Sequence, residues 1–255
     1  MTHDWRAERT RRGESLDARD GTTQDERTVM RLRLGVGVIG VLLPLALPLG
    51  NWLFAELRGQ DTTDFWPGSM SGAYYTSTRN ILVGSLCALG VFLICYRFDR
   101  RDDRWSTAAG VFALGVALFP TAPHGATAFQ ETVGVLHLVL AGLLLFVLAM
   151  FCIHSFRNPH YVQRPWVSRG YLVAGALILL FGALAVVTGL TGVGADWEIR
   201  PLYLCEWLSV WAFGAAWIGA ALELGSDIDA LGRSRPLLNG LGPAIDPADL
   251  PPAQP

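Results

Sequence analysis

A few polar side chains interrupt the long apolar stretches of this chain, and their types are those that bind ligands or support chemistry. Glu206 and Trp207 share one apolar run, His137 lies within another, and Arg79 and Asn80 open a third. Because polar groups inside a membrane are costly, we expect these residues to mark a functional site. The candidate ligand-binding residues are Ser71, Tyr74, Tyr75, Arg79, Asn80, His137, Glu206 and Trp207.

Three interpretations of this cluster remain open. In the first, Arg79 and Glu206 form a structural ion pair, and His137 donates to a neighbouring hydroxyl. In the second, Arg79 faces the anion of a lipid headgroup or small amphiphile, and Tyr and Trp side chains line the walls. In the third, His124, His137 and a carboxylate hold Zn²⁺, which activates water. Because the spacing of His124, Glu131 and His137 is unlike the helical HExxH motif, we assign no catalytic residue, metal ligand or cofactor.

The composition is that of a membrane protein. Of 255 residues, 51% are hydrophobic and only 16% are charged, against about 25% in soluble domains. The formal net charge of -2 does not favour nucleic acid as a partner. The four cysteines (87, 95, 152 and 205) lie in apolar stretches, where a free thiol packs as a small hydrophobe.

Six apolar segments are long enough to be considered as membrane spans, since a helix needs about 17–25 residues to cross the hydrocarbon core. We therefore predict an all-α fold in which six transmembrane helices form one bundle. The predicted spans are 33–54, 80–97, 106–123, 132–154, 170–192 and 202–223. No polar stripe runs the length of any of them, and no repeat relates the two halves, so neither a channel nor a transporter is favoured.

The arginines predict the orientation of the bundle. All but three of the 20 basic residues fall on one side of the six-helix arrangement, and the exceptions are Arg58, Arg79 and Arg200. The positive-inside rule places that side, with both termini, in the cytoplasm. We expect a multi-pass protein of the cell membrane, with Trp52, Trp66 and Trp197 at the outer boundary and Trp105 and Trp166 at the inner one.

The membrane domain is predicted to cover 30–224, and the flanking segments to be solvated tails. Residues 1–28 interleave acidic and basic side chains without apolar periodicity, so we expect disorder there. Residues 225–255 are rich in proline and are expected to form a flexible cytoplasmic tail. The first outer loop, 55–79, is long for a connection, and its aromatic residues predict a folded lid over the outer mouth of the bundle.

Small residues recur every fourth position on two of the predicted helices, which lets helix backbones approach closely in a membrane. The stripes are Ala109, Ala113 and Ala117 on the third helix and Ala212, Ala216 and Ala220 on the sixth. They are compatible with packing within one chain or with a dimer, so the oligomeric state stays open. Pro44, Pro48 and Pro120 are expected to kink or end helices.

Two stretches resemble a known group of proteins: SMSGAYYTSTRNILVG at 69–84, continuing to Gly90-Val91-Phe92, and GVFALGVALFPT at 110–121. They resemble bacterial six-helix integral membrane proteins classed as a domain of unknown function. The layout of 30–224 is more distantly similar to the DRAM-like family. This resemblance implies six helices, cytoplasmic termini and an association with membrane or lipid homeostasis.

A second, more remote similarity is to the CREST superfamily of membrane hydrolases, which use a Ser, an Asp and three His around a metal on seven helices. Ser71 and two histidines can be matched, whereas a third outer histidine, an Asp within a helix and a seventh helix are missing. We therefore expect non-catalytic binding of a membrane lipid headgroup or amphiphile, or a structural role in the envelope. The alternative is a metal-dependent lipid hydrolase of the CREST type.

Overall fold

The computed structural model describes residues 5–59, 65–96, 100–123, 125–157 and 165–239. All regular structure in these ranges is helical. The elements are α1 (Trp5–Leu57), the 3₁₀ helix η1 (Ser71–Tyr75), α2 (Arg79–Cys95), α3 (Arg100–Leu118), α4 (Ala128–Met150), the π-helical turn η2 (Phe151–Ser155), α5 (Pro165–Thr191) and α6 (Pro201–Asn239).

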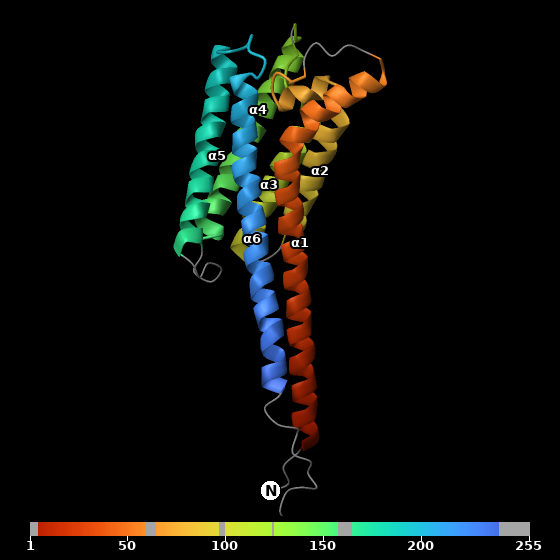
Figure 1. Ribbon diagram of the computed structural model, residues 1–255, viewed down its shortest axis with the longest axis vertical. Coiled ribbons are helices and arrows are strands. Elements are labelled where there is room, and N and C mark those ends of the chain that lie inside the picture. The colour runs from red at the N-terminus through yellow and green to blue at the C-terminus, as the bar shows by residue number, and fades with distance from the viewer. Residues whose placement is uncertain (1–4, 60–64, 97–99, 124, 158–164, 240–255) are drawn as a thin grey trace, which may run out of the picture.

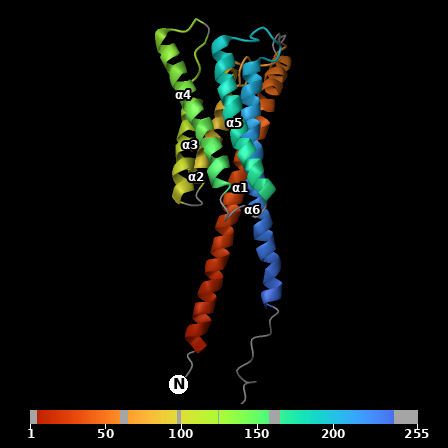
Figure 2. The same ribbon diagram turned by 90° about the vertical axis from the view of Figure 1, so that its left-hand side faces the viewer.

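The helices run alternately up and down, and each packs against its neighbour in sequence. Because α6 also packs along α1, the six long helices close into a ring. The start of α1 and the end of α6 project beyond the bundle at the same end (Figures 1 and 2). We call this the proximal end. The opposite end, which carries η1 and the start of α4, is the distal end.

Each of the six predicted spans overlaps one described helix, although α1 and α6 are much longer than their spans. Four helical segments are long and apolar enough to cross a membrane: Arg27–Leu57, Ala128–Ser155, Pro165–Thr191 and Pro201–Ser226. The apolar helix Arg79–Cys95 is shorter, at 17 residues. A helical bundle compatible with a membrane is therefore confirmed.

The outward faces of these helices are apolar, as lipid contact requires. Only 17% of the most apolar window of α5 is buried inside the protein, against 44% for α1. Leu180 and Val186 on α5 and Val135 on α4 are each more than half exposed. Soluble monomers rarely expose large contiguous apolar patches, so this surface is typical of a protein that contacts lipid hydrocarbon.

Several helix ends differ from expectation, and α6 continues to Asn239, into the segment 225–255 that we expected to be a flexible tail. α1 begins at Trp5, so helix covers most of 1–28, where we expected no regular structure. This segment holds six arginines, which favour helix, and it continues a helix already nucleated by the apolar span. α3 ends at Leu118 rather than at 123, because Pro120 removes a backbone donor and restricts the residue before it.

The small-residue stripes pack within the chain. Ala109, Ala113 and Ala117 are buried, and a side-chain carbon added at Gly110 would lie 2.6 Å from the carbonyl oxygen of Gly90 on α2. A carbon added at Gly37 on α1 would similarly lie 2.9 Å from the carbonyl oxygen of Gly214 on α6. These contacts bring backbones together as small residues do in membrane bundles.

A hydrogen bond from α6 replaces the one that Pro48 removes from the α1 helix. Pro48 has no N–H, so the carbonyl of Pro44 lacks its usual helical donor. The hydroxyl of Tyr203 donates to that carbonyl oxygen at 2.6 Å, and Tyr203 is fully buried. The bond satisfies a polar group that would otherwise be orphaned in the interior. It also fixes α6 against α1 near the distal end.

An aromatic cluster fills the proximal half of the bundle. Trp217 is fully buried and contacts the rings of Tyr96, Phe151 and Phe156 at centroid distances of 5.3–5.6 Å. Within this cluster the guanidinium of Arg33 is only 3% exposed. From the sequence we expected Arg33 to be a charge of the N-terminal tail, whereas the structure places it in the core.

Candidate functional site

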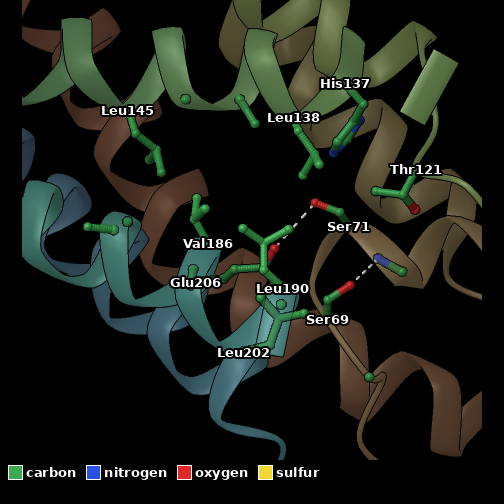
Figure 3. A pocket seen from close by; sticks show the side chains of 18 of the residues that line it. Ser69, Ser71, Thr121, His137, Leu138, Leu145, Val186, Leu190, Leu202 and Glu206 are labelled. Atoms are coloured by element: carbon green, nitrogen blue, oxygen red, sulfur yellow. Dashed lines mark hydrogen bonds between the residues drawn. The ribbon is translucent and has the colours of Figure 1, made fainter. Parts of the chain in front are cut away.

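A cavity of about 830 Å³ lies between α4 and α5 in the distal half of the bundle. Residues of α6 form its back wall, and the segment around η1 covers its distal end (Figure 3). This volume is typical of small-molecule sites, which span about 300–1,000 Å³. The cavity therefore has room for a molecule larger than a few waters.

The walls of the cavity are apolar stripes on the facing helices. Leu138, Ala141, Gly142 and Leu145 follow one another at helical spacing on α4. The α5 stripe has the same spacing and consists of Leu179, Gly182, Ala183, Val186, Gly189 and Leu190. Several of these side chains are also exposed, including Leu138 at 58% and Leu190 at 80%. The cavity thus reaches the surface between the two helices.

The gap arises because α4 and α5 approach closely only toward the proximal end. There, a side-chain carbon added at Gly175 would lie 3.0 Å from the carbonyl oxygen of Ala149 and 2.6 Å from Ile153. Beside the cavity, a carbon added at Gly142 would meet nothing within 4 Å. The two helices therefore diverge from Gly175 toward the distal end, as the second view shows (Figure 2).

Polar groups gather at the distal end of the cavity. Glu206, on α6, accepts a hydrogen bond from the Met70 amide at 2.5 Å and a long one from the Ser71 hydroxyl at 3.5 Å. Figure 3 draws the bond between the Ser71 hydroxyl and the Glu206 carboxyl group. The loop before η1 is thus tied to α6 through the Glu206 carboxyl group.

The predicted lid is confirmed over Phe65–Thr78. Met70 and Ala73 are buried, and they form a second core with Leu43, Leu47 and Leu82. The hydroxyl of Tyr75 donates to the carbonyl oxygen of Thr121 at 2.5 Å, which joins the lid to the segment after α3. Partial burial, followed by the charge effect of Tyr74, raises the pKa of Tyr75, although Arg79 lowers it. The hydroxyl therefore remains a donor at neutral pH.

His137 lines the cavity and has one ring nitrogen without a described hydrogen-bond partner. Its side chain is 3% exposed, and its Nδ1 lies 2.6 Å from the carbonyl oxygen of Phe119. Its Nε2 is buried and has no hydrogen-bond partner among the described residues. A buried polar atom without a partner costs about 1–3 kcal/mol, and such an atom in a cavity wall marks a place where a ligand can bind.

The eight candidate residues divide into two groups. Ser71, Tyr75, His137 and Glu206 line the cavity. Tyr74, Arg79, Asn80 and Trp207 are not part of its lining. Trp207 instead packs against Trp66 at a centroid distance of 5.6 Å, beside the lid core.

The expected ion pair between Arg79 and Glu206 is wrong. Arg79 is exposed, its Nε donates to the Tyr74 carbonyl oxygen at 2.6 Å, and its guanidinium lies 4.6 Å from the centre of the Tyr74 ring. Asn80 is exposed beside it. The reason is helical geometry: Arg79 begins α2, which faces α1 and α3 around the ring, whereas Glu206 faces the cavity from α6.

Neither Arg200 nor the glycines of the α4–α5 groove were predicted from the sequence to belong to the site. Arg200 is exposed and lines the cavity rim, and its Nη1 would lie 2.5 Å from a side-chain carbon added at Gly68. The signal for the groove was present in the sequence, because Gly142 and Gly182 fall on apolar stripes at helical spacing.

No group of three His, Cys, Asp or Glu side chains able to hold a metal occurs among the described residues. His124, which the zinc interpretation requires, lies outside the described residues. The hydrolase alternative therefore stays a prediction without a metal site in its support.

Comparison of the chain with models of known families, with characterised proteins and with solved structures finds no match.

Proposed function

We propose that the distal cavity binds a membrane lipid or a similar amphiphile. The observation that supports this function is that the cavity lining has two parts. Apolar stripes of α4 and α5 line most of its length, and the polar residues Ser71, His137 and Glu206 are grouped at one end. A hydrocarbon tail fits the stripes, and a polar headgroup fits the capped end. Because the cavity reaches the surface between two lipid-facing helices, a lipid can enter it sideways from the bilayer.

Filling the cavity tests this function. The change Gly142→Phe places a ring in the open space beside Gly142, where no atom lies within 4 Å of an added carbon. We expect at least a tenfold loss of co-purified lipid, which corresponds to about 1.4 kcal/mol of binding free energy. The measurement is quantitative lipid analysis of the protein purified in mild detergent.

Gly142→Ala is the matched control, because it removes the same glycine and leaves most of the cavity open. It is expected to retain lipid like the unchanged protein, and both variants should show unchanged thermal unfolding. Undiminished lipid in a folded Gly142→Phe protein would contradict the binding function and favour a structural role in the envelope.

We further propose that the bundle crosses the cell membrane six times, with the proximal end in the cytoplasm. The arginine distribution and the common proximal position of the helix ends support this orientation. The distal cavity would then face the outer leaflet. The resemblance to bacterial six-helix proteins remains a prediction and adds no reaction to this function.

Impermeant thiol labelling of intact cells checks the orientation. In a background without native cysteines, Asp196→Cys in the exposed α5–α6 connection should label fully. Arg104→Cys, exposed near the start of α3, should label only after the membrane is permeabilised. Labelling of position 104 in intact cells would overturn the orientation without affecting the cavity.

A further inference from the structure

The unpartnered nitrogen of His137 shows which hydrogen-bonding character a ligand must have. A carbonyl oxygen can only accept, so the bond to Phe119 at 2.6 Å requires the proton on Nδ1. In the neutral ring Nε2 is then an acceptor. It is buried and has no partner among the described residues, and the His137 residue lines the cavity. The group that satisfies it must therefore be a donor.

Glu206 adds a second acceptor to the same end of the cavity. Its carboxylate receives one amide and one hydroxyl, which leaves part of its capacity of about four hydrogen bonds unused. In the described part of the chain no arginine forms an ion pair with it: Arg79 binds Tyr74, and Arg200 lies at the exposed rim. A carboxyl group in the wall of an apolar cavity is stabilised in its ionised form by a cationic partner, so this position favours a cationic ligand group.

Ser71 and Tyr75, which also line the cavity, favour a cationic ligand group that donates hydrogen bonds as well. The Ser71 hydroxyl donates its proton toward Glu206, so its lone pairs face the cavity as acceptors. The ring of Tyr75 also lines the cavity, and aromatic faces attract cations. His137 of α4, Glu206 of α6 and Ser71 of the lid thus lie around the same end of the cavity (Figure 3).

We propose that the cavity selects amphiphiles whose headgroup carries a primary ammonium, an inference that rests on the proposed binding function. Three N–H donors match His137 Nε2, the Glu206 carboxylate and the Ser71 oxygen. The positive charge neutralises Glu206, and the hydrocarbon tail follows the α4 and α5 stripes. A quaternary ammonium carries the same charge without N–H donors, and a glycerol headgroup carries donors without the charge.

The test uses the full chain reconstituted in vesicles of equal parts phosphatidylethanolamine, phosphatidylcholine and phosphatidylglycerol. The lipids retained after mild detergent extraction are counted by native mass spectrometry. We expect the ethanolamine lipid to exceed the choline lipid about tenfold, the ratio that corresponds to one charge-assisted hydrogen bond. Glu206→Gln, which keeps an acceptor but loses the charge, and His137→Phe, which loses the acceptor, should each bring that ratio close to one.

The outcomes separate this selectivity from the binding function. Equal retention of the three lipids by the unchanged protein, with loss of all three in Gly142→Phe, would overturn the ammonium selectivity and leave lipid binding intact. Preference for phosphatidylglycerol would also overturn it, and would assign recognition to Arg200. Because the ratio is measured first on the unchanged protein, the result does not depend on whether either substituted chain folds.

Discussion

Replacing Arg33 with Met is expected to lower the free energy of unfolding by about 3–5 kcal/mol, because hydrogen bonds to a charged group contribute about 1.5–3 kcal/mol each and Arg33 binds both Tyr96 and Ala220. Nε and Nη2 of Arg33 donate to the Tyr96 hydroxyl at 3.2 and 2.7 Å, and Nη1 donates to the Ala220 carbonyl oxygen at 3.1 Å. The guanidinium also lies 5.3 Å from the centre of the Phe156 ring. One side chain thus joins α1 to the end of α2, to α6 and to the segment after η2.

Arg31→Met is the control, because Arg31 is exposed on the same helix and its loss changes the net charge equally. It should alter stability by less than about 0.5 kcal/mol, as surface substitutions usually do. Arg33→Lys should recover only part of the loss, since one ammonium cannot reproduce a fork that reaches Tyr96 and Ala220 together. Reversible unfolding in detergent measures all three variants. Equal losses at positions 31 and 33 would show that the buried network contributes nothing.

The positions of the helices could be predicted from the sequence because hydrophobic length is a local property. Each predicted span overlaps one described helix, from α1 to α6. The helix ends were less predictable, because they depend on the polar residues that flank each apolar run. Thr127 caps α4 with a reciprocal bond to Gln130, so the helix begins at Ala128, before the span predicted from 132.

The site residues could be predicted in part. The contacts between them could not, because a sequence does not give the rotation of one helix against another. His137 and Glu206 were found because polar residues in apolar runs are conspicuous. Arg79 was paired with Glu206 only because both were expected near the same membrane face. Arg33 was counted as a topological charge because its aromatic surroundings come from α2 and from the chain after α4, far away in sequence.

Removal of the Glu206 side chain is expected to detach the lid from the bundle. In Glu206→Ala the Met70 amide loses the only partner described for it, and the Ser71 hydroxyl loses its acceptor. A buried donor left without a partner costs about 1–3 kcal/mol, and the Ser71 bond is long, so we expect a loss of about 3 kcal/mol in unfolding free energy. Because Met70 and Ala73 pack in the lid core, we expect the lid to be destabilised more than the bundle as a whole.

Hydrogen exchange at the amides of 68–75 measures this detachment directly. Exchange there should accelerate in Glu206→Ala, while the amides around Trp217 in the proximal core keep their protection. Glu198→Ala removes an exposed carboxylate from the α5–α6 connection and should leave both regions unchanged. In Glu206→Gln the lid amides should exchange at a rate between those of Glu206→Ala and the unchanged protein. The reason is that the Gln amide oxygen still accepts from Met70. If the lid kept its protection in Glu206→Ala, its position would depend on its apolar core and on Tyr75 alone, and Glu206 would remain in the cavity for its ligand rather than for the fold.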